Sequence, residues 1–177
     1  PESFDAGELE AFLSQRYGFQ TAFRRPDTLK GVIDGVKIDC IAHKYAYLRQ
    51  PYAESGIRLY SIEDIVAMKL SAIADDGSRL KDFVDIACLS TRIPFYEMLK
   101  CYERKFPQAN VIRPFKALTY FDDIDFGEDI VMLNFEYDWK QIARRLKEMT
   151  VRQEHIFSQW PLKEQKRPVA EDKDMTS

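Results

Sequence analysis

The 177-residue chain is 45% hydrophobic and 13% aromatic, which allows a real core and excludes disorder throughout. Its 26 Lys and Arg residues nearly balance its 29 Asp and Glu residues, and the formal net charge of −3 excludes a global positive field that would attract nucleic acid from a distance. No apolar run reaches the length of a membrane span, and the three cysteines form no CxxC motif, so we expect a cytoplasmic protein that does not contact a membrane.

The first predicted elements are a short helix and a three-stranded antiparallel sheet. Asp5 is a typical N-cap for a helix that Gly18 would end. Two extended segments follow, and Asp34-Gly35 predicts a tight hairpin into a third strand. Alternation places Asp39 in the middle of that strand, away from its most apolar face. Asp39 is therefore either a functional carboxylate or a solvent-face residue that pairs with a lysine across the sheet.

After residue 60 the hydrophobic pattern becomes helical. Ser61 followed by Asp64 is typical of a helix N-terminus. The apolar positions of this helix form a stripe at Ile62, Ile65, Val66, Leu70 and Ile73. Lys69 falls within the stripe, where another leucine would be expected.

A second helix is predicted to begin near Ser78. It carries Asp82 and Asp85, which are three positions apart and therefore neighbours on the helix surface. Each polar residue also has an ordinary explanation. The Lys69 ammonium can reach water over an apolar stem, Asp85 can pair with Lys81, and Asp82 can interact with the helix dipole.

From Pro94 onward three more helical stretches are predicted, with an acidic loop at 122–129 that does not fit a calcium-binding template and is interpreted as solvated. We expect the tail to be disordered, because it has almost nothing to bury. The predicted domains are a sheet region at 1–60, a helical region at 61–160 and a disordered tail at 161–177, which together give an α+β fold. No zinc motif, GxSxG elbow, P-loop or GxGxxG motif is present.

The joint arrangement of these residues is more informative than any one of them. A strand aspartate after a hairpin, the segment "SIEDIVAMK" at 61–69 and then "RLKDFVD" at 79–85 resemble the bacterial AbiEii/AbiGii family of nucleotidyltransferase-type abortive-infection toxins. The resemblance implies a partial polymerase-β-like nucleotidyltransferase fold, in which a mixed or antiparallel sheet with helices precedes a helical C-terminal region. It also implies Mg²⁺ as cofactor and a nucleoside triphosphate as substrate.

The resemblance further implies a role for each site residue. Asp39 matches a strand-borne carboxylate that holds magnesium. Lys69 matches the lysine that meets the triphosphate, and Arg79 would add a phosphate contact. Asp82 and Asp85 match the acidic pair of the family, with Asp85 orienting the site and Asp82 pairing with Lys69 or with a base.

The family's first motif, a Gly-Gly or Gly-Ser turn and an Asp-x-Asp strand, is expected upstream of Phe4. We therefore expect this chain to be the C-terminal major part of a nucleotidyltransferase, inactive as it stands. The complete protein would transfer a nucleotide from Mg-NTP to RNA, tRNA or protein, within a toxin-antitoxin system that supplies an antitoxin partner.

Two other classes of function remain open at this point. The chain is alternatively a catalytically dead binding module that holds an antitoxin-like protein through an exposed apolar face at 94–121. A small nucleic-acid-binding protein is the third hypothesis, because one helix carries Lys140, Arg144, Arg145, Lys147 and Arg152. In the alternative interpretation, these basic residues form the solvated face of a helix whose Ile142, Leu146 and Met149 turn inward.

Overall fold

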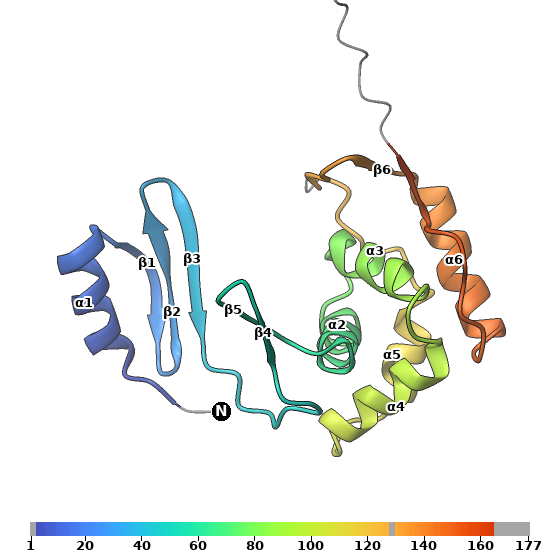
Figure 1. Cartoon of the computed structure of the whole chain (residues 1–177), viewed down its shortest axis with the longest axis horizontal. Helices are drawn as coiled ribbons and strands as arrows, with labels where there is room; N and C mark the ends of the chain where they lie inside the picture. Colours follow the sequence, from blue (N-terminus) through green and yellow to red (C-terminus); the bar gives the residue numbers. More distant parts are fainter. Residues whose placement is uncertain (1–2, 128–129, 165–177) are drawn as a thin grey trace, which may run out of the picture. The chain divides into compact units, whose positions relative to one another are not determined.

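The computed structural model describes residues 3–127 and 130–164 (Figure 1). Helices and small antiparallel sheets form it, so the predicted α+β class is confirmed. The chain divides into two compact units, Pro1–Ala46 and Tyr47–Ser177. The functional domains proposed at 1–60 and 61–160 stay predictions.

The N-terminal unit consists of α1 (Ala6–Tyr17) and the antiparallel sheet β1-β2-β3. The strands are Gln20–Arg25, Thr28–Ile33 and Val36–Ile41. Asp5 caps α1 by accepting hydrogen bonds from the backbone N–H groups of Gly7 and Glu8, and Gly18 ends it in the left-handed conformation. Asp34 and Gly35 join β2 to β3 with φ values of 48° and 80°, as a type I′ hairpin turn requires.

The small core of this unit is built from Ala6, Phe19 and Leu29, which are at most 7% exposed. Leu9 and Leu13 of α1 pack against this core, as their spacing predicts. Phe12 of the same helix is 51% exposed, because a short helix on a small sheet buries only a narrow stripe.

The C-terminal unit begins with a hairpin that the sequence analysis did not identify. Strands β4 (Tyr52–Glu54) and β5 (Ile57–Leu59) pair in antiparallel fashion. Ser55 and Gly56, with φ values of 51° and 79°, form the turn between them.

A bundle of helices makes up most of the second unit. The helices are α2 (Ile62–Asp75), α3 (Leu80–Leu89), α4 (Phe95–Lys105), α5 (Ile112–Ala117) and α6 (Trp139–Val151). Their core includes Leu70, Phe83, Met98 and Tyr102, all at most 1% exposed. Burial of these large side chains is the main favourable contribution to the stability of the bundle.

Strands β6 (Phe135–Tyr137) and β7 (Leu162–Glu164) form a short antiparallel pair beside the bundle. The disordered tail was predicted to begin at residue 161, but residues 162–164 pair with β6 as a strand. The rest of that tail, 165–177, lies outside the described residues. In the part of the chain that the structure covers, no helix is long and apolar enough to cross a membrane.

Candidate functional site

Lys69 lies at the boundary between the buried and the exposed faces of α2. Val66, Leu70 and Ile73 turn into the core, whereas the Lys69 side chain is 27% exposed. The next helix, α3, packs beside α2 and presents Asp82 in its first turn. Asp85 follows one turn later, so both carboxylates lie near the same point of α2.

The Lys69 ammonium is held between these two carboxylates. Its Nζ lies 2.6 Å from Oδ1 of Asp82 and 2.7 Å from Oδ2 of Asp85. The side chain of Asp82 is only 2% exposed, whereas that of Asp85 is 48% exposed. The predicted pairing of Asp82 with Lys69 is thus present, and the same lysine is also the partner of Asp85.

Electrostatics keep this lysine protonated. Burial alone would lower the pKa of Lys69, but the hydrogen bonds that it donates to Asp82 and Asp85 outweigh burial and raise it. Because the pKa lies above the ordinary value of a lysine, the ammonium is present at neutral pH. The two carboxylates therefore hold a protonated ammonium at a fixed, partly exposed position.

The second oxygen of Asp82 is nearly unpartnered. Oδ2 is buried and accepts no hydrogen bond from the described residues. Nη1 of Arg79 lies 3.7 Å away, and the Arg79 side chain is 51% exposed. Arg79 thus adds a second, half-exposed cation beside Asp82.

The acidic loop contributes backbone to this site. The N–H of Asp125 donates to the carbonyl of Ser78 (2.8 Å), and Arg79 and Asp125 form a short parallel bridge. Ile124 is only 7% exposed and belongs to the core. The interpretation of 122–129 as a purely solvated loop is therefore wrong for its middle, which fixes the segment that carries Arg79; residues 128–129 lie outside the described residues.

Asp39 belongs to the N-terminal unit, so the structure describes it apart from the Lys69 group. It faces Lys30 across β2 and β3, and the ammonium lies 3.4 Å from the carboxylate. Asp39 is 54% exposed. This contact is the cross-strand lysine pair that the sequence analysis gave as the ordinary explanation.

The described residues do not by themselves fit magnesium. No group of three or more His, Cys, Asp or Glu residues that could hold a metal ion occurs among them. Asp39 offers a single carboxylate that already has a lysine beside it, whereas Mg²⁺ demands near-ideal octahedral oxygen coordination. The metal-ligand role of Asp39 consequently stays a prediction.

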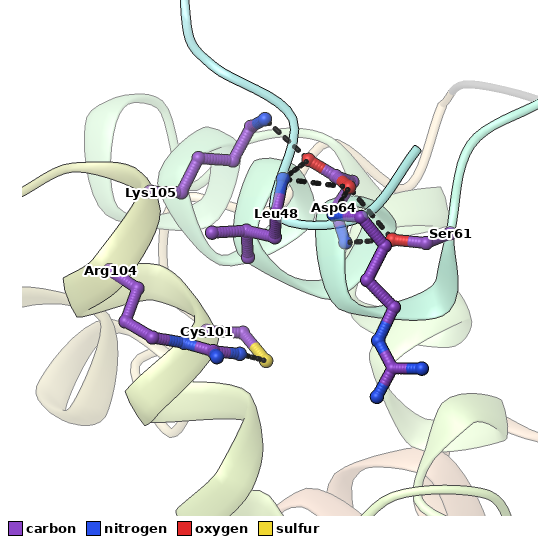
Figure 2. Close-up of polar contacts among 7 residues, drawn as sticks. Leu48, Ser61, Asp64, Cys101, Arg104 and Lys105 are labelled. Carbon is purple, nitrogen blue, oxygen red and sulfur yellow. Dashed lines mark hydrogen bonds and ion pairs between the residues drawn. The ribbon is translucent and has the colours of Figure 1, made fainter. Parts of the chain in front are cut away.

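A buried polar cluster in the same unit was missed by the sequence analysis (Figure 2). Asp64 was interpreted only as part of a helix start, but it accepts hydrogen bonds from Lys105 Nζ, from Ser61 Oγ and from the N–H groups of Leu48 and Arg49. Burial raises the pKa of Asp64, and these hydrogen bonds outweigh it and lower the pKa to about 2. The cluster anchors residues 48–49 to α2 and α4.

Similarity to known proteins covers the residues of the candidate site. A model of the family described as "Nucleotidyl transferase AbiEii toxin, Type IV TA system" matches residues 32–161. A protein of Aquifex aeolicus (strain VF5), "Uncharacterized protein aq_aa25", is 27% identical over 148 residues, which cover 81% of this chain and 70% of that protein. No solved structure matches the chain significantly. Asp39, Lys69, Arg79, Asp82 and Asp85 all lie within the matched range.

Proposed function

Because the chain belongs to the AbiEii family of nucleotidyl transferase toxins of type IV toxin-antitoxin systems, we propose that its Lys69 site binds the triphosphate of a nucleotide donor. In nucleotidyl transfer an acceptor hydroxyl forms a new bond to the α-phosphorus while the bond to the β-phosphate breaks. The hydroxyl loses its proton to solvent, and pyrophosphate leaves. Negative charge grows on the phosphate oxygens, which nearby cations stabilise.

One observation carries the proposal: the Lys69 ammonium is held by Asp82 and Asp85 at 2.6 and 2.7 Å and remains 27% exposed. A lysine whose position is fixed in advance loses little conformational freedom when a phosphate binds. Asp82 is the positioning residue, since it is buried and bonded to Lys69. Arg79 adds a phosphate contact, and Asp85, which is half-exposed, orients the lysine from the solvent side.

The proposal is confined to these residues. The resemblance implies magnesium, and nucleotidyl transfer on the family pattern uses it, but the described residues alone do not form its site. The proposed roles of Lys69 and Arg79 therefore concern binding and charge only. They are independent of which groups hold the metal.

The first experiment measures transfer of label from each of the four α-labelled, magnesium-bound ribonucleoside triphosphates to total cellular RNA. It compares this chain with a chain extended upstream by the Asp-x-Asp strand that the resemblance implies. We expect label from the extended chain alone. Absence of label from both would contradict the proposed transfer to RNA, and equal label from both would contradict the predicted need for the upstream strand.

A second candidate function is the binding of an antitoxin-like protein without catalysis. The face predicted for it, on the helices at 94–121, has only Tyr96, Ile112 and Tyr120 half-exposed. Larger exposure occurs elsewhere, with Val131 at 89% and Leu133 at 81%. Pull-down with wild-type bait and with a Val131→Ser/Leu133→Ser variant tests this candidate, because a partner held by these residues is lost only from the variant.

A further inference from the structure

A polar cavity of 240 Å³ lies between α6 and the chain that follows it, residues 155–161. Three of its lining residues are arginines: Arg144, Arg145 and Arg152. Glu148 is the carboxylate among the described residues that line it. The cavity therefore carries an excess of positive charge in a protein whose overall formal charge is −3.

The inner wall of this cavity is fixed by Arg145. Its guanidinium donates to Ser90 Oγ (3.0 Å) and to the carbonyl of Gln159 (2.8 Å). The Arg145 guanidinium also lies 4.1 Å from the centre of the buried Phe157 ring, and that of Arg152 lies 5.7 Å from the same centre. Contacts of this kind fix the direction of both cations before a ligand arrives.

Glu148 offsets only part of the positive charge of the cavity within the described part of the chain. There, none of the three arginines forms an ion pair with a carboxylate. Burial, together with the like charge of Arg144, lowers the pKa of Arg145 despite the opposing effect of Glu148. An anion bound in the cavity would offset its excess of positive charge.

We propose that this cavity is a phosphate-binding site, which takes a free phosphate ion or one phosphate group of a nucleotide strand. Guanidinium groups bind phosphate oxygens through two parallel hydrogen bonds, and several guanidinium groups favour a ligand with several charged oxygens. The cavity is smaller than the roughly 300–1,000 Å³ typical of pockets that enclose a whole ligand, so it fits one group rather than an entire nucleotide. Trp160, which lines the cavity and is 53% exposed, is stacked against Phe135 on one side of its ring, so a neighbouring base can stack only on the other side.

The test uses the chain without triphosphate and with a chelator, so that its outcome does not depend on the proposed transfer. Binding of inorganic phosphate is measured by calorimetry, and binding of a 5′-labelled single-stranded oligoribonucleotide by fluorescence anisotropy over a range of salt concentrations. The variant is Arg144→Gln/Arg152→Gln, because both side chains are exposed and their loss leaves the Arg145 contacts in place. Circular dichroism confirms that the variant is folded.

The control is Arg16→Gln/Lys116→Gln, which removes two exposed positive charges outside the cavity. We expect the cavity variant to weaken binding at least about tenfold and to reduce the salt slope for RNA by about 0.7 for each phosphate that is no longer neutralised, with a much smaller effect in the control. If the cavity variant weakens binding of RNA alone, the ligand is a phosphate group of a nucleotide strand. If it weakens binding of both probes, the site also accepts the free phosphate ion. Equal effects in variant and control, or no binding of either probe to the wild type, would overturn the proposal.

Discussion

Asp64 and Lys105, 41 positions apart in the sequence, form a fully buried ion pair that joins α2 to α4. The Lys105 Nζ lies 2.6 Å from Oδ1 of Asp64, and both side chains are 0% exposed. The Asp64 carboxylate also accepts hydrogen bonds from the Ser61 hydroxyl and from the backbone N–H groups of residues 48–49. Asp64 therefore links the start of α2, the end of α4 and the chain before the β4–β5 hairpin (Figure 2).

Replacement of Asp64 by asparagine should lower the free energy of unfolding by about 3–5 kcal/mol, because a buried ammonium is left beside a neutral amide. The matched control is Asp75→Asn, since Asp75 pairs with Arg113 at 3.1 Å while both side chains are more than half exposed. An exposed pair of this kind contributes only about 0–1 kcal/mol. Urea denaturation measures both, and similar costs for the two variants would show that burial of the Asp64 pair has no special effect.

The low pKa of Asp64 predicts a specific loss of stability in acid. Its pKa is about 2 in the folded chain and 3.8 as the ordinary value, so the carboxylate contributes stability that is complete above about pH 4 to 5. That contribution, about 2 kcal/mol, is lost as the pH falls from there to 2. Thermal unfolding of the wild type and of Asp64→Asn between pH 2 and 6 measures it. The difference between the two proteins should shrink toward pH 2, and a constant difference would contradict the assignment.

Local features of the chain were predicted well from the sequence, and long-range contacts were predicted poorly. Asp34-Gly35 fixes its hairpin through the backbone of two residues, and Ser61 caps its helix within one turn, so neither depends on distant chain. The Asp64–Lys105 pair depends on residues that are distant in the sequence, and the residues around Asp64 and Lys105 give no indication that the two side chains meet. The Ser55-Gly56 turn was a readable local signal that was missed.

For the candidate site, spacing showed that Asp82 and Asp85 share a helix surface and that Lys69 interrupts the apolar stripe of its helix, and the resemblance linked the three residues. Neither source showed that one ammonium contacts both carboxylates, because the α2–α3 packing sets that geometry. The role of the Asp125 backbone could not be predicted from the sequence either, because its hydrogen bond to Ser78 joins segments that are far apart in the chain.

Gly31 should tolerate no side chain. A Cβ at this position would lie 2.3 Å from the carbonyl oxygen of Gln20 and 2.4 Å from the Phe19 ring, so β1 would have to move. We expect Gly31→Ala to destabilise the N-terminal unit by about 1–3 kcal/mol. Gly77→Ala is the control, because its Cβ would meet only one atom, at 3.6 Å. Hydrogen exchange of the β1 amides measures the effect, and unchanged protection in Gly31→Ala would refute this account of the sheet.

Lys69→Ala should destabilise the helical unit. The substitution leaves the buried Asp82 carboxylate without its 2.6 Å partner, a loss of about 3 kcal/mol or more. Lys69→Met/Asp82→Leu should cost less than Lys69→Ala alone, since no charge is then buried. A double-mutant cycle in urea measures the coupling, and additive costs would mean that the pair is energetically unimportant.

The role of Lys69 in nucleotidyl transfer must therefore be tested with variants that keep the site folded. In the upstream-extended chain, Lys69→Arg preserves the positive charge beside Asp82 but changes its shape and reach, so transfer should fall strongly while the unfolding midpoint stays near wild type. Asp85→Asn removes the half-exposed carboxylate and costs little stability; because Asp82 still holds the lysine, transfer should fall less than in Lys69→Arg. Label transfer and urea midpoints are measured on the same preparations. A purely structural lysine predicts the opposite pattern, in which Lys69→Arg transfers label at nearly the wild-type rate, and that result would remove Lys69 from the proposed triphosphate site.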